Sequence, residues 1–171
     1  MAQLIKNRAL ARDSWQLPEP GAAPPDGGDL LVPLARWLQE RDTLSSRAGR
    51  TGVWLEADAD PTALAPDLDR LQLIAIRFAS FTDGRGYSLA RLLRERHGYR
   101  GELRAIGDVL RDQLFYLSRC GFDAFALRAD QNAEQALAAF KDFSETYQAS
   151  VDRPEPLFRR RLAAASKSKA F

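Results

Sequence analysis

Apolar positions along the chain follow two spacings, one typical of strands and the other typical of helices. Short apolar runs predict strands over residues 51–56, 71–78, 102–106 and 122–127. The second run is nearly continuous, which is typical of a strand covered on both faces in a parallel sheet. Between and around these runs, apolar residues recur every three or four positions and predict helices. The predicted helices lie over residues 33–49, 61–69, 89–99, 109–119 and 133–143, the third with an apolar stripe of Leu89, Leu92 and Leu93.

This alternation predicts the fold class. Strands that alternate with helices at short spacing form right-handed βαβ units and a parallel sheet. We therefore expect a single α/β domain with a mostly parallel sheet of about four to five strands, either open or resembling half of a (βα)₈ barrel. Such a sheet leaves exposed edges, which a homodimer would cover.

The chain divides into three parts by composition. Residues 1–29 are expected to form a small ribbon and a Pro/Gly-rich loop, and residues 30–148 the α/β core domain. Residues 149–171 lose the helical period and carry Arg159, Arg160 and Arg161, so we expect a basic, flexible tail.

Composition and charge narrow the classes of partner and compartment. The 171 residues are 45% hydrophobic and 28% charged, as in an ordinary globular domain, with a formal net charge of +2. This near balance gives no reason to expect nucleic acid or a membrane as the partner. The single cysteine, Cys120, cannot form an internal disulfide, so the cytoplasm is the expected compartment. One cysteine and one histidine argue against an all-protein zinc or iron–sulfur site.

Polar residues follow three of the predicted strands. The carboxyl ends of parallel strands meet at one edge of a sheet, where ligands bind, and helix N-termini there favour anions. Asp83 and Asp108 are the candidate acid and base of a catalytic site. Arg85 would hold a small anion with a two-pronged contact. The candidate ligand-binding residues are Thr82, Gly84, Arg85, Gly86, Tyr87, Ser88, Arg104, Arg111, Asp112 and Arg128.

A structural interpretation of the same residues stands beside the functional one. Asp83 and Asp108 occupy positions where a helix N-cap is wanted, and such a cap stabilises a helix by roughly 1 kcal/mol without any other role. Gly84 and Gly86 would simply permit the turn. The two interpretations stay open at this point.

Cofactor motifs do not decide between the functional and the structural interpretation. Gly84 and Gly86 lack the third glycine of a dinucleotide fingerprint, since residue 89 is leucine. The sequence also has no phosphate-binding Gly-x-x-x-x-Gly-Lys loop and no nucleophile elbow. The identity of any cofactor is therefore unknown.

Three long blocks carry a family resemblance: residues 81–88, 101–117 and 120–128. With them, the chain from about Leu30 to Tyr147 resembles a bacterial family of domains of unknown function. That family is described as an oxidoreductase family involved in sulfite reduction, and its members are typically encoded beside assimilatory sulfite reductase.

The resemblance implies a role in sulfur assimilation and cysteine biosynthesis. We expect an accessory protein of assimilatory sulfite reduction that binds sulfite reductase, its electron donor or a small oxyanion at the strand ends. The alternative is an enzyme, such as an oxidoreductase, that acts at the same site on an anionic sulfur- or phosphate-containing metabolite.

Overall fold

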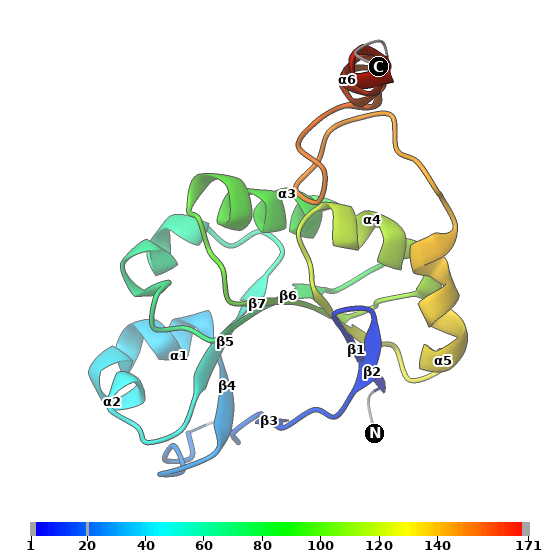
Figure 1. Cartoon of the computed structure of the whole chain (residues 1–171). Helices are drawn as coiled ribbons and strands as arrows, with labels where there is room; N and C mark the ends of the chain where they lie inside the picture. The colour runs from blue at the N-terminus through cyan, green and yellow to red at the C-terminus, as the bar shows by residue number, and fades with distance from the viewer. Residues whose placement is uncertain (1–2, 20, 169–171) are drawn as a thin grey trace.

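A curved β-sheet forms the centre of the computed structural model, which describes residues 3–19 and 21–168 (Figure 1). In these residues the sheet has eight strands in the order β2-β1-β8-β7-β6-β5-β4-β3. The strands are β1 (Gln3–Lys6), β2 (Ala9–Ala11), β3 (Trp15–Gln16), β4 (Asp29–Pro33), β5 (Thr51–Glu56), β6 (Leu73–Phe78), β7 (Glu102–Gly107) and β8 (Ala124–Leu127).

The expected single α/β domain is confirmed, but the expected four to five parallel strands are wrong. Strands β3 to β8 run parallel, while β1 is antiparallel to both β2 and β8. The N-terminal ribbon is therefore part of the sheet, and its hairpin turns at Asn7 and Arg8 with φ values of +51° and +62°. The sequence analysis also missed β4, because its short apolar run lies between a Pro/Gly-rich loop and Pro33.

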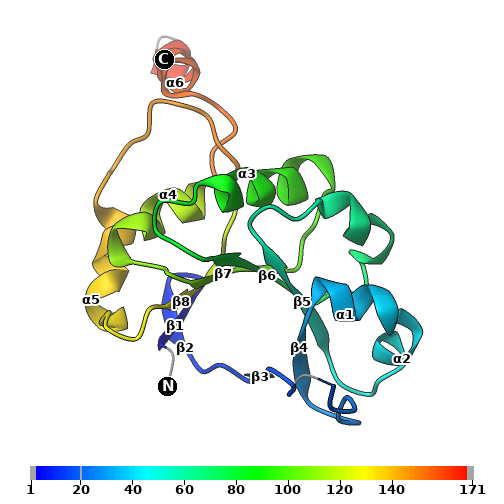
Figure 2. The same ribbon diagram turned by 180° about the vertical axis from the view of Figure 1, so that it is seen from behind.

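The sheet is curled into a half-barrel, which was one of the two expected forms (Figure 2). Strands β2 and β3 stand at opposite ends of the strand order, yet only residues 12–14 connect them. A link of this length spans at most about 14 Å, whereas a flat sheet would hold these two edges about 34 Å apart. The sheet must therefore curl, and the short edge strands leave less backbone exposed than expected. A homodimer that covers them stays a prediction.

Helices cover the outer face of the curled sheet (Figures 1 and 2). They are α1 (Leu34–Gln39), α2 (Arg41–Ser45), η1 (Pro61–Asp67), α3 (Arg85–Arg91), η2 (Leu92–Arg96), η3 (Arg111–Gln113), α4 (Leu114–Arg119), α5 (Ala133–Ala136) and η4 (Leu137–Lys141). A last helix, α6 (Leu157–Ser168), lies outside this layer (Figure 1).

The predicted apolar stripe of the third helix is partly wrong. Segment η2 is a π-helical turn in which the His97 N–H bonds to the Leu92 carbonyl, five residues back. This wider turn leaves Leu92 38% exposed, while Leu89 and Leu93 remain buried.

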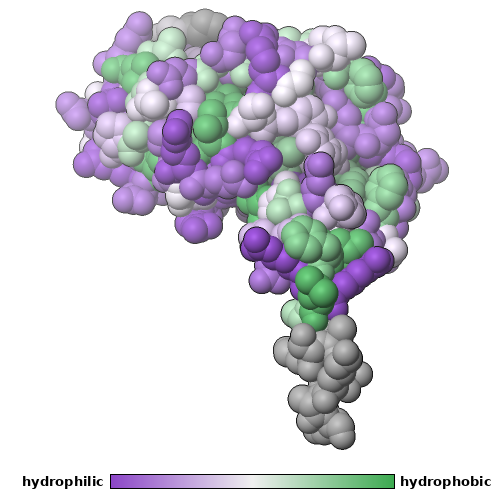
Figure 3. Space-filling model, turned by 90° about the horizontal axis from the view of Figure 1, so that it is seen from above, coloured by the Kyte–Doolittle hydropathy of each residue, from purple (hydrophilic) through white to green (hydrophobic). Residues whose placement is uncertain are grey.

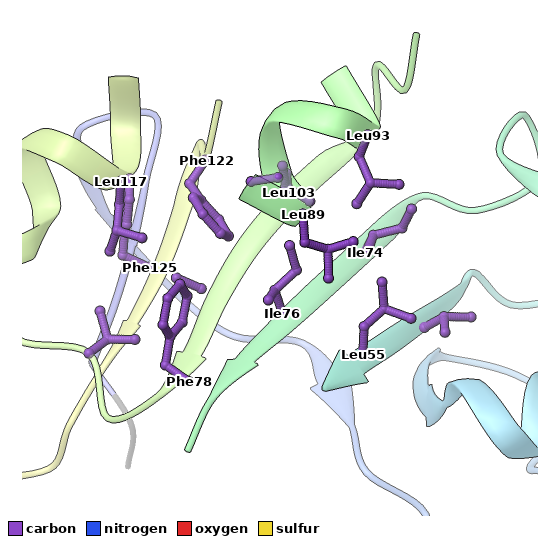
Figure 4. Packing of buried hydrophobic residues seen from close by; sticks show 14 of the residues in the cluster. Leu55, Ile74, Ile76, Phe78, Leu89, Leu93, Leu103, Leu117, Phe122 and Phe125 are labelled. Carbon is purple, nitrogen blue, oxygen red and sulfur yellow. The ribbon is translucent and has the colours of Figure 1, made fainter. Parts of the chain in front are cut away.

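Two unequal cores lie on the two faces of the sheet. The larger one fills the space between the sheet and the outer helices, where Ile76 and Phe78 of β6 meet Leu89 of α3 (Figure 4). The smaller one lies on the inner face, where Leu73 and Ala75 pack with the neighbouring tryptophans and with Leu31. Because β6 is buried on both faces, the nearly continuous apolar run in its sequence is explained.

The C-terminal helix α6 stands away from the rest of the molecule (Figure 1). The sequence analysis predicted no regular structure after residue 149, but α6 has 12 residues. The flexibility of this segment stays a prediction. Residues 1–2, 20 and 169–171 of the predicted terminal parts lie outside the described residues.

Candidate functional site

The carboxyl ends of the parallel strands bring the predicted loops together at one edge. The register pairs Glu56 with Arg77 and Phe78 with Gly107, so the loops that follow β5, β6 and β7 lie side by side. We call this surface the strand-end face and define it by Glu56, Asp58, Arg77, Asp83, Arg85, Asp108, Arg128 and Asp130.

Arg85 joins the loops after β5 and β6. Its Nε and Nη2 atoms donate to the two Asp83 carboxylate oxygens at 2.9 and 2.8 Å, and its Nη1 atom donates to Asp58 Oδ2 at 3.1 Å. The Arg85 side chain is 61% exposed. Two carboxylates thus already occupy the guanidinium, and a small anion would have to compete with both of them.

Arg128 repeats this arrangement after β8. Its Nε and Nη2 atoms donate to the Asp130 oxygens, both at 2.7 Å, and its Nη1 atom donates to Asp108 Oδ1 at 2.7 Å. The other Asp108 oxygen accepts the Phe81 N–H at 2.9 Å. Asp108 therefore ties together the loops after β6, β7 and β8.

The ion pairs change the acidity of two of these carboxyl groups. The hydrogen bonds from Arg85 lower the pKa of Asp83 to about 2, and those from Arg128 do the same to the pKa of Asp130. A carboxyl group with so low a pKa stays ionised at neutral pH, which suits an ion pair better than proton transfer. Since Asp58 and Asp108 add two more carboxylates to these clusters, negative charge exceeds positive charge around Arg85 and Arg128.

Neither candidate catalytic residue occupies an N-cap position, because the N-cap of α3 is Gly84 and that of η3 is Leu110. Asp83 lies one residue before the N-cap of α3, and its Oδ1 atom accepts the N–H of Arg85, the first residue of α3, at 3.1 Å. The catalytic roles of Asp83 and Asp108 stay predictions.

The turn before α3 contains both packed and exposed candidates. Gly86 is buried, and a Cβ atom there would lie 2.7 Å from the Phe78 ring. Tyr87 packs edge-on against the same ring at 5.4 Å, and its hydroxyl accepts a 3.3 Å hydrogen bond from Gln113. Gly86 and Tyr87 therefore hold the outer core together.

The other residues of this turn are open to solvent. Thr82 and Gly84 are exposed, and the Thr82 hydroxyl lies 3.1 Å from the Ser80 hydroxyl. Ser88 is also exposed and lines a shallow hollow on α3 beside Arg91. Of the predicted motif, Thr82, Gly84 and Arg85 face the solvent at the strand ends.

Arg104 lies away from this surface, on the inner face of the sheet, and is 2% exposed. Its Nε donates to Glu102 Oε1 at 2.8 Å, and its Nη1 donates to both Asp13 oxygens at 2.9 Å. Lys6 pairs with the other Glu102 oxygen at 2.6 Å. Because Asp13 belongs to the short link between β2 and β3, this network fastens the link across the inner face.

Arg111 and Asp112 form no part of the Arg85 and Arg128 clusters. Arg111 pairs with Asp142 at 3.1 Å. Asp112 is exposed and lines a groove between α4 and residues 142–148.

The candidate residues of the sequence analysis lack four members of the strand-end face, which are Glu56, Asp58, Arg77 and Asp130. Arg77 contacts Glu56 on the neighbouring strand through Nε at 2.9 Å, and its guanidinium lies 5.7 Å from the Trp54 ring centre. Asp58 follows β5 and holds Arg85. The acidic turn after residue 56 was a visible signal, but the pairing of Glu56 with Arg77 depends on the register between two strands.

Among the described residues, no group of three or more His, Cys, Asp or Glu side chains is placed so that it could hold a metal ion. No helix within the described ranges is both long and apolar enough to span a membrane.

Comparison with known proteins identifies the family. Curated proteins gave no match to the chain. The model of a family described as "Bacterial protein of unknown function (DUF934)" matches residues 52–158, which run from the second residue of β5 to the start of α6 and include the whole strand-end face. This match covers more than half of the chain, and the protein therefore belongs to this bacterial family of unknown function.

Proposed function

We propose that this protein is an accessory protein of assimilatory sulfite reduction, and that it binds a partner protein through the strand-end face. The observation that carries the proposal is the pairing at this face. Two exposed arginines are each held by two carboxylates, and the carboxylates are in excess. A rigid, solvent-exposed charged surface of this kind steers and orients a protein with complementary charge.

The same pairing favours a partner protein over a small oxyanion. An oxyanion would have to displace Asp83 from Arg85, or Asp130 from Arg128, and would meet the remaining carboxylates. A partner that carries Lys or Arg side chains would instead meet Asp58 and Asp108 favourably. We therefore propose a basic patch on the partner.

The sulfite-reduction context rests on the resemblance of residues 81–88, 101–117 and 120–128. It suggests sulfite reductase or its electron donor as the partner, in the cytoplasm. Binding to either of these partners requires no redox cofactor on this chain.

Binding to purified sulfite reductase and to its electron donor tests the proposal. We expect Asp58→Lys/Asp130→Lys to weaken binding at least about tenfold, because two favourable charges become repulsive. The control is Asp69→Lys/Glu95→Lys, which changes the net charge equally at exposed positions in the connections that lead into β6 and β7. The proposal is wrong if neither protein binds, or if both double variants bind like the wild type.

The second candidate function is an enzyme that acts on an anionic metabolite. The position of the clusters around Arg85 and Arg128 favours this function. Asp83, Arg85 and Asp108 lie at the edge where (βα)₈ enzymes carry their catalytic residues. A thermal-shift screen with sulfite, sulfate, adenylylated sulfur compounds, flavins and nicotinamides tests it, since binding to the folded state raises the melting temperature. A ligand whose shift disappears in Arg85→Ala, with the melting temperature of the free protein preserved, would favour the enzyme.

A further inference from the structure

A groove with an aromatic floor and an acidic rim lies between α4 and residues 142–148. Its volume is about 410 Å³. The Phe115 and Phe143 rings lie 4.9 Å apart along it, tilted by 52° to each other. Tyr116, Phe143 and Tyr147 are each more than half exposed. Exposed aromatic clusters of this kind mark contact surfaces for other macromolecules.

Three carboxyl groups and one arginine, Arg119, line the groove. Asp112 and Asp142 line it, and Asp142 pairs with Arg111 at 3.1 Å. Within the described ranges, Asp112 forms no ion pair. Glu145, also on the rim, pairs with Arg153 and Arg160 of the same chain.

Helix α6 has the complementary character. Phe158 is about half exposed, and the Arg159 guanidinium lies 5.9 Å from its ring centre. Arg159 and Arg161 are exposed and form no salt bridge among the residues that the structure describes, although Arg161, after Arg160 and Arg153, helps to lower the pKa of Glu145. Figure 3 shows apolar side chains gathered beside strongly hydrophilic ones on the part of the surface that leads out to this helix. With 12 residues, α6 is about 18 Å long.

The first turn of α6 is fixed to the end of its own groove. The Leu157 N–H donates to the Tyr147 carbonyl at 3.1 Å, and Arg160 donates to Glu145 at 2.8 Å. The rest of the helix points away from the body (Figure 1). The helix therefore does not cover its own groove, although the Arg160–Glu145 pair shows that the two surfaces match in charge.

We infer that two copies of this chain exchange these surfaces, so that α6 of each copy lies in the acidic aromatic groove of the other. In the dimer Phe158 packs on the aromatic floor, and Arg159 and Arg161 pair with Asp112 and Asp142 of the partner copy. One two-fold axis forms both contacts at once, as in most homodimers. The interface shares no residue with the strand-end face.

An anionic membrane is the main competing occupant, because a basic amphipathic helix also binds lipid surfaces. The carboxyl groups of the groove argue against a membrane as the occupant. Asp112, Asp142 and Glu145 lie beside the base of α6 and would be repelled by anionic headgroups. The same three residues favour the arginines of a second copy.

Sedimentation analysis of the full chain over a concentration series tests the inference. We expect the wild type to dimerise, and both Asp112→Arg/Asp142→Arg and Arg159→Glu/Arg161→Glu to weaken dimerisation at least about tenfold. An equimolar mixture of the two variants should recover dimers, because each contact in the mixed dimer is again complementary. Asp58→Lys/Asp130→Lys should dimerise like the wild type, which separates this inference from the proposed partner binding.

Three results would overturn the inference. They are a wild type that stays monomeric at every concentration, a dimer that neither double variant weakens, and a mixture that recovers nothing although circular dichroism shows both variants folded. A monomeric wild type that sediments with phosphatidylglycerol vesicles would assign α6 to a membrane surface instead.

Discussion

At the scale of single residues, Arg104 shows how a predicted site residue can have a different place in the molecule. Its guanidinium is buried between Glu102 and Asp13, and it holds the link between the two edge strands. Breaking a buried ion pair by removing one partner leaves the other charge without compensation. Arg104 is therefore expected to affect stability more than binding.

Arg104→Met should lower the free energy of unfolding by about 3 kcal/mol, because Glu102 stays buried with only Lys6 as its partner. Urea denaturation measures this loss. Arg96→Met is the control, since Arg96 is exposed and its replacement should change stability by no more than about 0.5 kcal/mol. Equal losses in the two variants would show that the buried network contributes nothing.

Asp83 and Asp130 make a prediction about acid stability. Their pKa values are about 2 in the folded protein, below the ordinary value of 3.8. Between pH 4 and pH 2 the unfolded chain therefore binds more protons than the folded one, so stability falls as the pH is lowered through this interval. The contribution is fully present above about pH 4.

Asp83→Asn/Asp130→Asn should make the unfolding free energy depend less steeply on pH between about 4 and 2. Urea denaturation at several pH values measures the slope. The slope above pH 5 should be the same in both proteins and serves as the internal control. An unchanged slope below pH 4 would mean that the ion pairs with Arg85 and Arg128 do not persist in solution.

At the scale of elements, the start of α3 contains one tightly packed glycine and one open glycine. Gly86 lies against the Phe78 ring, whereas a Cβ atom at Gly84 would have nothing within 4 Å. The two positions are neighbours in the same motif, so they form a matched pair.

Gly86→Ala should lower the unfolding free energy by about 1–3 kcal/mol through overpacking against Phe78. Gly84→Ala should change it by less than about 1 kcal/mol, because its φ of −83° suits any residue. Thermal or urea unfolding of both variants measures the two losses of stability. The assigned packing at α3 would be contradicted by two variants of equal stability.

The elements also show what the sequence could predict. Strands β5, β6 and β7 were predictable because their apolar runs are flanked by polar turns. The ribbon that contains β1 was predicted, but its pairing with β8 was not, because that pairing joins distant parts of the chain. Strand β4 gave a weak signal, because its short apolar run lies between a Pro/Gly-rich loop and a proline. Leu92 was misassigned because a π-helical turn has no signature in the spacing of leucines.

The candidate site was predictable in its place but not in its pairing. The turns after the strands gave Asp83, Arg85, Asp108 and Arg128. Their partners depend on which strands are neighbours, as Asp58 with Arg85 shows over a separation of 27 residues. Arg104 was misplaced for a related reason, since Asp13 lies 91 residues away in the chain.

At the scale of the whole molecule, the curled sheet gives the protein two separate charged surfaces. The strand-end face collects exposed Arg–Asp clusters from the four loops that follow β5, β6, β7 and β8. The groove beside α4 and the projecting α6 form the second surface. The two proposed interfaces share no residue, so the proposed dimer would leave the strand-end face open to the proposed partner.

The most direct measurement of the central claim is the affinity of purified sulfite reductase, and of its electron donor, for this protein at low and at raised salt. The wild type is expected to bind one of them, more weakly at raised salt, because exposed charges are screened. Asp58→Lys/Asp130→Lys should lose at least about tenfold in affinity at low salt, while Asp69→Lys/Glu95→Lys keeps the wild-type value. Affinity that depends on neither salt nor Asp58 and Asp130, or the absence of binding to both proteins, would contradict the claim.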